Sequence, residues 1–454
     1  MPACQPWCAR RLRASWSSLF DGVAKRRSVR ATLGTSVVNL VVLCINLGTG
    51  LLTAKYLGPQ GRGELAAMIL WPQFLASLIT LGLPQATTFT MVRQPEERQA
   101  IAGASLLLSV GLGFVATAVG LLVIPFWLTQ YDASVVGLAQ GVMLLSPIIM
   151  FMWSVNACLQ AHGMFALYNR NLYLQPSLAL AGLIALAATH RFTPHAAALV
   201  TMLAPLPVFV TNLIWLCRHQ RPCLTDFMAN TERLLHYGLR SCGIQILGTL
   251  ALQFDSFFVL RALNPAAVGL YMVARSAAKP TIVFANALNT VLFPKASALS
   301  SDDAVELAAL ATRVGAVVAA IITVPLAIMG PYLISLLYGH AFLEATQPFQ
   351  LLVVEGALSA IAGTLAQAFM TVGRPGVVAS LQLVSFLAGV ALLVLLVPAY
   401  GIYGASAALL AGTIIRLIVT LACFPLILGI PLPRLWLSVD DLRFLMRTRT
   451  PAVS

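Results

Sequence analysis

Long apolar runs, separated by short polar breaks, recur along almost the whole of this 454-residue chain. A helix of about 20 apolar residues crosses the roughly 30 Å hydrocarbon core of a bilayer, and runs of this length are typical of membrane spans. Hydrophobic residues make up 59% of the sequence and charged residues 9%, whereas soluble proteins average about 45–50% and about 25%. The chain is therefore predicted to be an all-α polytopic membrane protein.

Twelve segments are long and apolar enough to be membrane spans, and most breaks between them contain glycine, proline or charged residues. The candidate spans cover approximately residues 32–54, 65–90, 100–126, 134–160, 168–189, 194–217, 237–261, 266–294, 308–337, 347–372, 376–398 and 402–428. The first break, AKYLGPQGRGELAAM, does not have the glycine spacing of a phosphate-binding loop. Because glycine tolerates positive φ and proline interrupts a helix, this break predicts the tip of a tight helical hairpin.

The distribution of basic residues predicts the orientation. With twelve spans both termini lie on one side of the membrane, and that side carries twenty Lys and Arg residues. The opposite loops carry only Lys55, Arg62, Arg191 and Arg261, so the positive-inside rule places both termini in the cytoplasm. We expect residues 1–30 to be a basic tail that contacts anionic lipid. A signal peptide is not expected there, because the following apolar run is too long and lacks a cleavage site.

The remaining composition gives no sign of a metal or nucleic-acid site. The eight cysteines and six histidines are dispersed, without the spacing of metal ligands, so we expect no metal and no cofactor other than a coupling ion. Basic residues do not interleave with aromatic residues in a patch, so we expect the net charge of +13 to lie in loops rather than to bind nucleic acid.

An internal repeat divides the chain into two halves. The segment TAKYLGPQGRGELAA, which begins at Thr53, aligns without gaps with VLRALNPAAVGLYMV, which begins at Val259, at an offset of 206 residues. The matched positions are Lys55 with Arg261, Leu57 with Leu263, Pro59 with Pro265, and Gly63 with Gly269. Polar positions of the preceding span match as well, namely Thr35 with Ser241, Asn39 with Gln245, and Thr49 with Asp255. Duplication explains this agreement better than chance does.

Two copies of six spans have the same orientation, because an even number of crossings returns the chain to its starting side. Parallel repeats of this kind are related by an axis along the membrane normal and are found in transporters that handle substrate between two bundles. We expect a cytoplasmic tail at 1–30, an N-terminal six-helix bundle at 31–217, a cytoplasmic connector at 218–236, a C-terminal six-helix bundle at 237–428 and a second tail at 429–454.

A polar stripe follows the first span and faces protein or water rather than lipid. Its members are Thr32, Thr35, Asn39, Asn46, Thr49 and Thr53. These side chains either form hydrogen bonds between helices, as is common in tight bundles, or line a cavity. The matching pattern in the second half favours the cavity.

Charged side chains within the spans are the sharper signal, because charge is costly in hydrocarbon. Arg275 and Lys279 are four residues apart and share one helical face, which Asn286 extends. The other intramembrane charges are Asp255, Glu355 and Arg416. Cations therefore exceed acids, so ion pairing alone cannot neutralise all of them, although an Asp255–Arg275 pair with a purely structural role is an open alternative.

Excess positive charge in a cavity favours an anionic ligand such as a phosphate or diphosphate group. We therefore predict that the substrate-binding residues are Arg275, Lys279, Arg416, Asn39, Asn46, Gln245 and Asn286. Asp255 and Glu355 are the candidate residues for a coupling ion, because a carboxylate in a low dielectric can carry H⁺ or help to coordinate Na⁺.

Four segments carry a resemblance to a known family. They are the hairpin TAKYLGPQGRGELA, its counterpart DSFFVLRALNPAAVGLYMVA, NTVLFPKAS and MTVGRPG. Together they resemble the polysaccharide-transporter, Wzx-type flippases of the multidrug/oligosaccharidyl-lipid/polysaccharide (MOP) exporter superfamily, over nearly the whole chain after residue 30. The chain departs from this family in having no charged residue in the middle of its first or second span.

The resemblance implies a V-shaped pair of six-helix bundles in the bacterial inner membrane. It implies transport of a polyprenyl-diphosphate-linked oligosaccharide to the outer leaflet by ion-coupled alternating access, with cationic residues such as Arg275, Lys279 and Arg416 on the diphosphate and sugar. A polysaccharide polymerase and chain-length machinery are the implied partners.

Other functions remain open. One alternative is an ion-coupled multidrug exporter on the same scaffold, whose cavity should prefer acids and aromatics to cations. A polysaccharide polymerase or glycosyltransferase would carry a long extracytoplasmic loop, whereas every outer loop expected here has about ten residues or fewer. A scaffold without transport would leave the polar stripe and the charges as packing.

Overall fold

The structure is a computed structural model that describes residues 26–296, 301–371 and 374–428. In these ranges the regular structure is helical and no strand occurs. The helices are α2 (Arg26–Ile79), α3 (Leu83–Arg93), α4 (Arg98–Trp127), α5 (Ala133–Val142), α6 (Ser146–Ala161), α7 (Phe165–Ala188), α8 (Pro194–Leu203), α9 (Pro205–Trp215), α10 (Phe227–Ala262), α11 (Pro265–Ala296), α12 (Ser301–Ile328), α13 (Gly330–Tyr338), α14 (Thr346–Thr371) and α15 (Pro375–Cys423). Short 3-10 or π segments are η1 (Pro95–Glu97), η2 (Met143–Leu145), η3 (Leu216–Gln220), η4 (His340–Ala345) and η5 (Phe424–Leu428).

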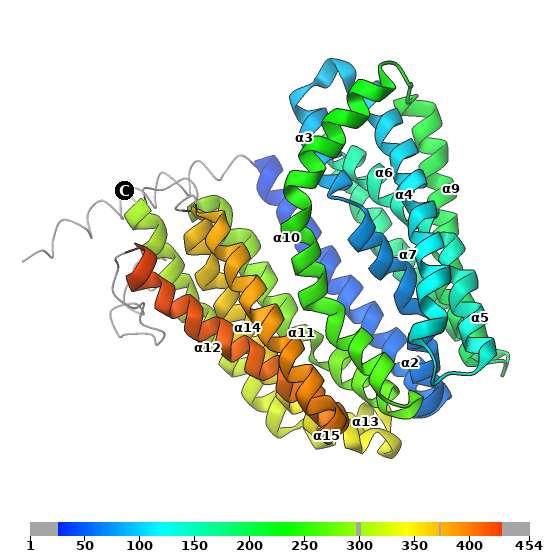
Figure 1. Cartoon of the computed structure of the whole chain (residues 1–454), viewed down its shortest axis with the longest axis vertical. Coiled ribbons are helices and arrows are strands. Elements are labelled where there is room, and N and C mark those ends of the chain that lie inside the picture. The colour runs from blue at the N-terminus through cyan, green and yellow to red at the C-terminus, as the bar shows by residue number, and fades with distance from the viewer. Residues whose placement is uncertain (1–25, 297–300, 372–373, 429–454) are drawn as a thin grey trace, which may run out of the picture.

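The helices form two bundles that lie side by side (Figure 1). Helices α2 to α9 make up the N-terminal bundle, in which α2 packs on α4, α7 and α8. Helices α11 to α15 make up the C-terminal bundle, in which α14 packs on α11, α12 and α15. Helix α10 runs along the boundary and contacts both bundles.

Several helices are long enough to cross a bilayer. In the described residues seven are long and apolar enough, or up to nine if each of two bent pairs is one span. Two of the seven, Val37–Ile79 and Gly376–Ile427, contain a glycine with non-helical backbone angles. Each of these two helices corresponds to two of the spans expected from the sequence.

The hairpin tip predicted from the sequence is present. Helix α2 changes direction at Gly58, where φ is 64° and ψ is −175°, a backbone conformation open almost only to glycine. Pro59 follows at once and cannot donate the helical hydrogen bond. Helix α15 turns in the same way at Gly401, where φ is 57° and ψ is −133°. Both turns lie at the lower end of the molecule in Figure 1, which we call the turn end.

The two bundles are joined at the turn end by aromatic side chains. The Phe257 ring of α10 lies 4.9 Å from the Trp71 ring and 4.0 Å from the Phe74 ring, both on α2. The indole nitrogen of Trp127 donates a 2.9 Å hydrogen bond to the Phe257 carbonyl. One buried cluster therefore continues from one bundle into the other.

Farther from the turn end, the bundles diverge (Figure 1). On α2, Ala54 is 1% exposed, whereas Val37, Leu40 and Val41 are 58%, 45% and 44% exposed. Residues 37, 40 and 41 share one face of the helix, whereas Asn39 and Asn46, which are also exposed, lie on the opposite side. This part of α2 therefore has few protein neighbours, as expected if the bundles form a V with its apex at the turn end.

Helix α10 is shared between the bundles. Its first turns pack on the N-terminal bundle, where Tyr237 stacks on Phe89 at 4.3 Å and Arg233 forms a 2.7 Å ion pair with Glu97. After a 49° bend between Gly243 and Gln245, its second half contacts α15 and α11. Phe227, the first residue of α10, falls within the connector expected at 218–236.

Two glycines bring α2 and α11 into direct backbone contact. A Cβ atom on Gly63 would lie 1.8 Å from the carbonyl oxygen of Pro265, and one on Gly269 would lie 1.8 Å from the carbonyl oxygen of Pro59. Gly63 and Gly269 are repeat counterparts, and so are Pro59 and Pro265. The contact is therefore the same when viewed from either helix, and the axis that relates the repeats passes between the two glycines.

We expect Gly63→Ala and Gly269→Ala to destabilise the protein by similar amounts, about 1–3 kcal/mol each, because a methyl group has no room between the backbones. Gly50→Ala is the matched control, since a Cβ on Gly50 faces Ser276 of α11 at 3.8 Å without a clash. Thermal unfolding in detergent measures the difference. Equal melting temperatures for the three variants would contradict the packing described here.

Candidate functional site

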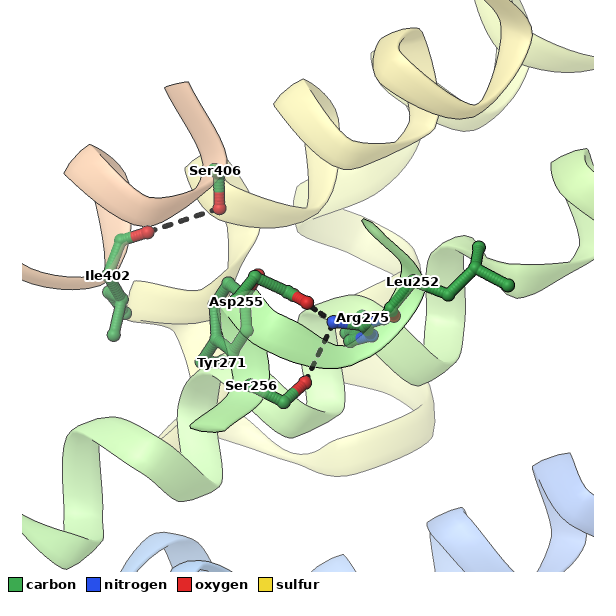
Figure 2. Close-up of polar contacts among 7 residues, drawn as sticks. All are labelled: Leu252, Asp255, Ser256, Tyr271, Arg275, Ile402 and Ser406. Carbon is green, nitrogen blue, oxygen red and sulfur yellow. Dashed lines mark hydrogen bonds and ion pairs between the residues drawn. The ribbon is translucent and has the colours of Figure 1, made fainter. Parts of the chain in front are cut away.

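Helices α10 and α11 bring Asp255 and Arg275 together (Figure 2). Asp255 is 2% exposed, and its Oδ2 atom accepts hydrogen bonds from Arg275 Nη1 and from the Tyr271 hydroxyl. Arg275 Nη1 also donates to the Ser256 hydroxyl at 2.7 Å, and Nη2 donates to the Leu252 carbonyl. In this conformation Arg275 is therefore engaged in the ion pair that the sequence left as an alternative to substrate binding.

The second oxygen of Asp255 has no such partner. Oδ1 is buried and makes no hydrogen bond within the part of the chain that the structure describes. A buried carboxylate oxygen without a partner is energetically costly. A bound proton or cation would remove that cost.

A second polar cluster joins α14 and α15. Glu355 Oε1 accepts a 2.8 Å hydrogen bond from the Thr413 hydroxyl. One turn along each helix, Arg416 Nη2 donates to the Ser359 hydroxyl at 2.8 Å and to the Ser359 carbonyl at 3.2 Å. Arg416 forms no ion pair with the acids of the described ranges, and its Nε atom is buried without a partner. Arg416 is therefore held by hydrogen bonds to neutral groups, and Glu355 acts on its charge without forming an ion pair.

Glu355 connects the two clusters electrostatically. Both Arg416 and Arg275 lie close enough for their charges to act on its carboxylate. The acids and guanidinium groups predicted from the sequence thus lie in one region of the C-terminal bundle.

Lys279 differs from the two arginines. Between Pro265 and Thr281 it is the only exposed residue of α11, and it makes neither a hydrogen bond nor an ion pair with described residues. Ser276, one turn earlier on the same side of α11, faces Gly50 of α2. Lys279 therefore extends toward the space beside α2, where the bundles begin to diverge.

Arg62 is a cation whose position the sequence did not predict. It was expected in an outer loop, but it belongs to α2 and is half-buried, with an Nε atom that is buried and without a partner among the described residues. Its charge acts on Lys279 and on Tyr338 of α13. Its repeat counterpart, Val268, is fully buried, and this apolar counterpart was the available signal that position 62 faces inward.

The predicted amide ligands lie on several helices. Asn39 and Asn46 are exposed on α2 and their side chains make no hydrogen bond in the described residues, while Gln245 is half-buried on α10. Thr35 donates to Asn169 at 3.1 Å, so part of the polar stripe does serve helix packing. The side chain of Asn286 lies outside the described residues.

The described ranges contain no group of three or more His, Cys, Asp or Glu residues that could hold a metal ion. They do contain a small pocket between α11, α12 and α14, which none of the predicted site residues lines. Four of its lining residues are threonines, namely Thr281, Thr312, Thr323 and Thr364.

A family model described as polysaccharide biosynthesis protein matches residues 53–347. The chain belongs to this family. The match confirms the resemblance drawn from the hairpin and its counterpart, and covers the glycine contact, Asp255, Arg275 and Lys279. No curated protein sequence matches the chain.

Solved structures of the MOP superfamily share the fold of this polysaccharide biosynthesis protein. An inward-facing multidrug resistance MATE family transporter has a TM-score of 0.71 at 18% identity, over 85% of this chain and 96% of that chain. The lipid II flippase MurJ in an inward closed conformation has a TM-score of 0.70 at 14% identity, over 92% and 93%. An outward-facing MATE family transporter has a TM-score of 0.62 at 18% identity, over 87% and 93%.

These similarities confirm the predicted fold class, an all-α membrane protein of MATE-like architecture.

We expect Asp255→Ala to destabilise the protein by about 3–5 kcal/mol, because it leaves the Arg275 charge without its counter-ion. The double variant Asp255→Ala/Arg275→Met should regain most of this loss, since it removes both charges. Glu97→Gln is the control, because the Glu97–Arg233 pair is 47% exposed at both side chains and should contribute less than about 1 kcal/mol. Thermal unfolding in detergent measures the relative stabilities of these variants. A double variant no more stable than Asp255→Ala would contradict the ion-pair explanation.

Proposed function

We propose that the protein is a flippase that carries a polyprenyl-diphosphate-linked oligosaccharide across the bacterial inner membrane for the synthesis of a surface polysaccharide. The observation that carries this proposal is Lys279, an exposed cation without a partner on the α11 face beside α2, in a chain of the polysaccharide biosynthesis protein family. MurJ, which shares the fold, is a lipid II flippase.

The charge of the site suits a diphosphate. Lys279 and Arg416 form no ion pair among the described residues, and a cation without an ion pair at membrane depth is costly. A diphosphate between the bundles would offset this cost through charge-assisted hydrogen bonds. Asn39, Asn46, Gln245 and Asn286 would supply neutral contacts around it.

Asp255 provides a route to ion coupling. While its carboxylate is charged it holds Arg275. A proton or Na⁺ at the unpartnered Oδ1 atom would weaken that ion pair and free the guanidinium group for the diphosphate. Substrate and coupling ion would then compete for the same side chain, Arg275. Glu355, on whose carboxylate the Arg275 charge acts, would be the second acid that takes part in ion coupling.

The remaining assignments accompany this proposal. Both termini are cytoplasmic, the six-helix bundles span 31–217 and 237–428 with a connector at 218–236, and the protein is a transporter without catalytic residues. A polysaccharide polymerase and chain-length machinery would act on its product.

A multidrug exporter is the second candidate, because MATE family transporters share the fold. The excess of cations around Lys279 disfavours lipophilic cations, the ligands that an acidic cavity would attract. Saturable binding of a fluorescent lipophilic cation, together with no binding of polyprenyl diphosphate, would favour the exporter.

We expect Lys279→Ala to abolish export of the surface polysaccharide and to weaken binding of a polyprenyl-diphosphate oligosaccharide by at least about tenfold, the loss of roughly one charge-assisted contact. Lys55→Ala is the matched control, because Lys55 is an exposed lysine of α2 close to the Gly58 turn. Binding by purified protein in nanodiscs and polysaccharide export by cells report the effect. Normal binding and export in Lys279→Ala would remove Lys279 from the site.

We expect Asp255→Asn to make transport insensitive to the ion gradient, because an amide cannot carry the coupling proton or bind Na⁺ with a full charge. Initial transport rates in proteoliposomes, measured with imposed pH and sodium gradients, test this. Glu97→Gln, an acid substitution outside the membrane-spanning interior, should keep the response of the parent. An unchanged gradient response in Asp255→Asn would exclude Asp255 from coupling.

A further inference from the structure

The N-terminal bundle exposes very little of the segment that follows the Gly58 turn. From Leu65 to Met91 every residue is described, and only Gln73 and Gln85 are exposed. Neither glutamine side chain forms a hydrogen bond with another described residue. Two amides are therefore the only exposed side chains between Leu65 and Met91.

Gln73 is the repeat counterpart of Lys279, at the same offset of 206 residues. Each is the single exposed residue of its segment, Gln73 between Leu65 and Thr80 and Lys279 between Pro265 and Thr281. Each lies ten residues beyond a glycine of the Gly63–Gly269 contact. Because the axis between the repeats passes through that contact, Gln73 and Lys279 face the same space from opposite bundles.

The chemistry of the exposed residue argues for water rather than lipid around it. A polar side chain that faces hydrocarbon has no hydrogen-bond partner, which is costly. Lipid-facing positions of this chain are apolar, as Phe114, Leu122 and Phe126 on α4 illustrate with exposures of 62%, 69% and 77%. Gln73 and Gln85 break this pattern, as expected of side chains that face water rather than lipid.

We propose that Gln73 and Gln85 form a glycan-binding wall on the N-terminal bundle, opposite the cationic side that binds the diphosphate. An amide donates and accepts hydrogen bonds without a charge, which suits sugar hydroxyls and gives a phosphate no electrostatic advantage. Gln73 lies on α2 and Gln85 on α3, twelve residues apart across the break between the two helices. Side chains on two successive helices can contact more than one sugar of an oligosaccharide.

This assignment rests on the proposed flippase function for the identity of the ligand, but the exposure of Gln73 to water can be tested alone. In a variant without native cysteines, Gln73→Cys should react with a water-soluble maleimide at a rate similar to that of Lys279→Cys. Leu122→Cys, which faces lipid on α4, should remain unlabelled. If Gln73→Cys were protected from the maleimide, the proposal that Gln73 lines a water-filled glycan-binding wall would be wrong.

Ligand preference is tested with two probes, polyprenyl diphosphate alone and polyprenyl diphosphate carrying an oligosaccharide. We expect Gln73→Leu and Gln85→Leu to weaken binding of the oligosaccharide-bearing lipid several-fold and to leave binding of polyprenyl diphosphate unchanged, whereas Lys279→Ala weakens both. Gln60→Leu is the matched control, because Gln60 is an exposed glutamine of the same helix at the turn end. Both leucine variants should fold, since an exposed position imposes no clash, and their melting temperatures check this.

The outcomes separate the two proposals. If the parent protein binds neither probe, the flippase function fails. If the parent binds both probes and the leucine variants lose affinity equally for both, or for neither, the glycan wall fails while the flippase function stands.

Discussion

The backbone contact between Gly63 and Gly269 fixes how the rest of the molecule is arranged. In a bilayer, lipid tails are as apolar as leucine, so helices associate through close packing and interhelical hydrogen bonds rather than through the hydrophobic effect. The glycine pair permits the closest approach of α2 and α11, and the Trp71, Phe74 and Phe257 rings extend it to α10. Because these contacts gather at the turn end, the other end is free to diverge, and the exposed turns of α2 begin there.

Duplication left the two bundles similar in backbone and different in charge. In the C-terminal bundle Asp255, Tyr271 and Arg275 form one hydrogen-bonded group. Their counterparts 206 residues earlier are Thr49, Leu65 and Ile69. The Thr49 hydroxyl donates to the Asn46 carbonyl of its own helix at 2.8 Å and requires no partner from another helix. All three positions therefore differ between the repeats, and in the C-terminal bundle removal of one member would leave a buried charge without its partner.

The sequence predicted the features that depend on local chemistry. The length of the apolar runs, the turn at Gly58 and the repeat offset each follow from residues that are close together or from direct alignment. Partner choice was not predictable in the same way, because helical periodicity reports which residues share a face and not what that face meets. Arg275 and Lys279 share a face of α11, yet one is held by Asp255 and the other is exposed. Arg62 was placed in an outer loop for the same reason. It lies only four residues after Gly58, so its position in the sequence suggested the loop, whereas packing against the other bundle turns it inward.

Repeat counterparts carry information that periodicity lacks. Within one helix Gln73 is an ordinary polar residue, and only its pairing with Lys279 across the glycine contact gives it a direction. Two counterpart positions that differ by one full charge make the electrostatic potential unequal on the two sides of the space between them, most strongly where salt does not screen it. An amphiphilic ligand with a charged diphosphate and a neutral glycan has a lower energy in one orientation than in the other in such a field. For the proposed lipid-linked glycan, this asymmetry would favour one orientation that a symmetric pair of bundles would leave undetermined.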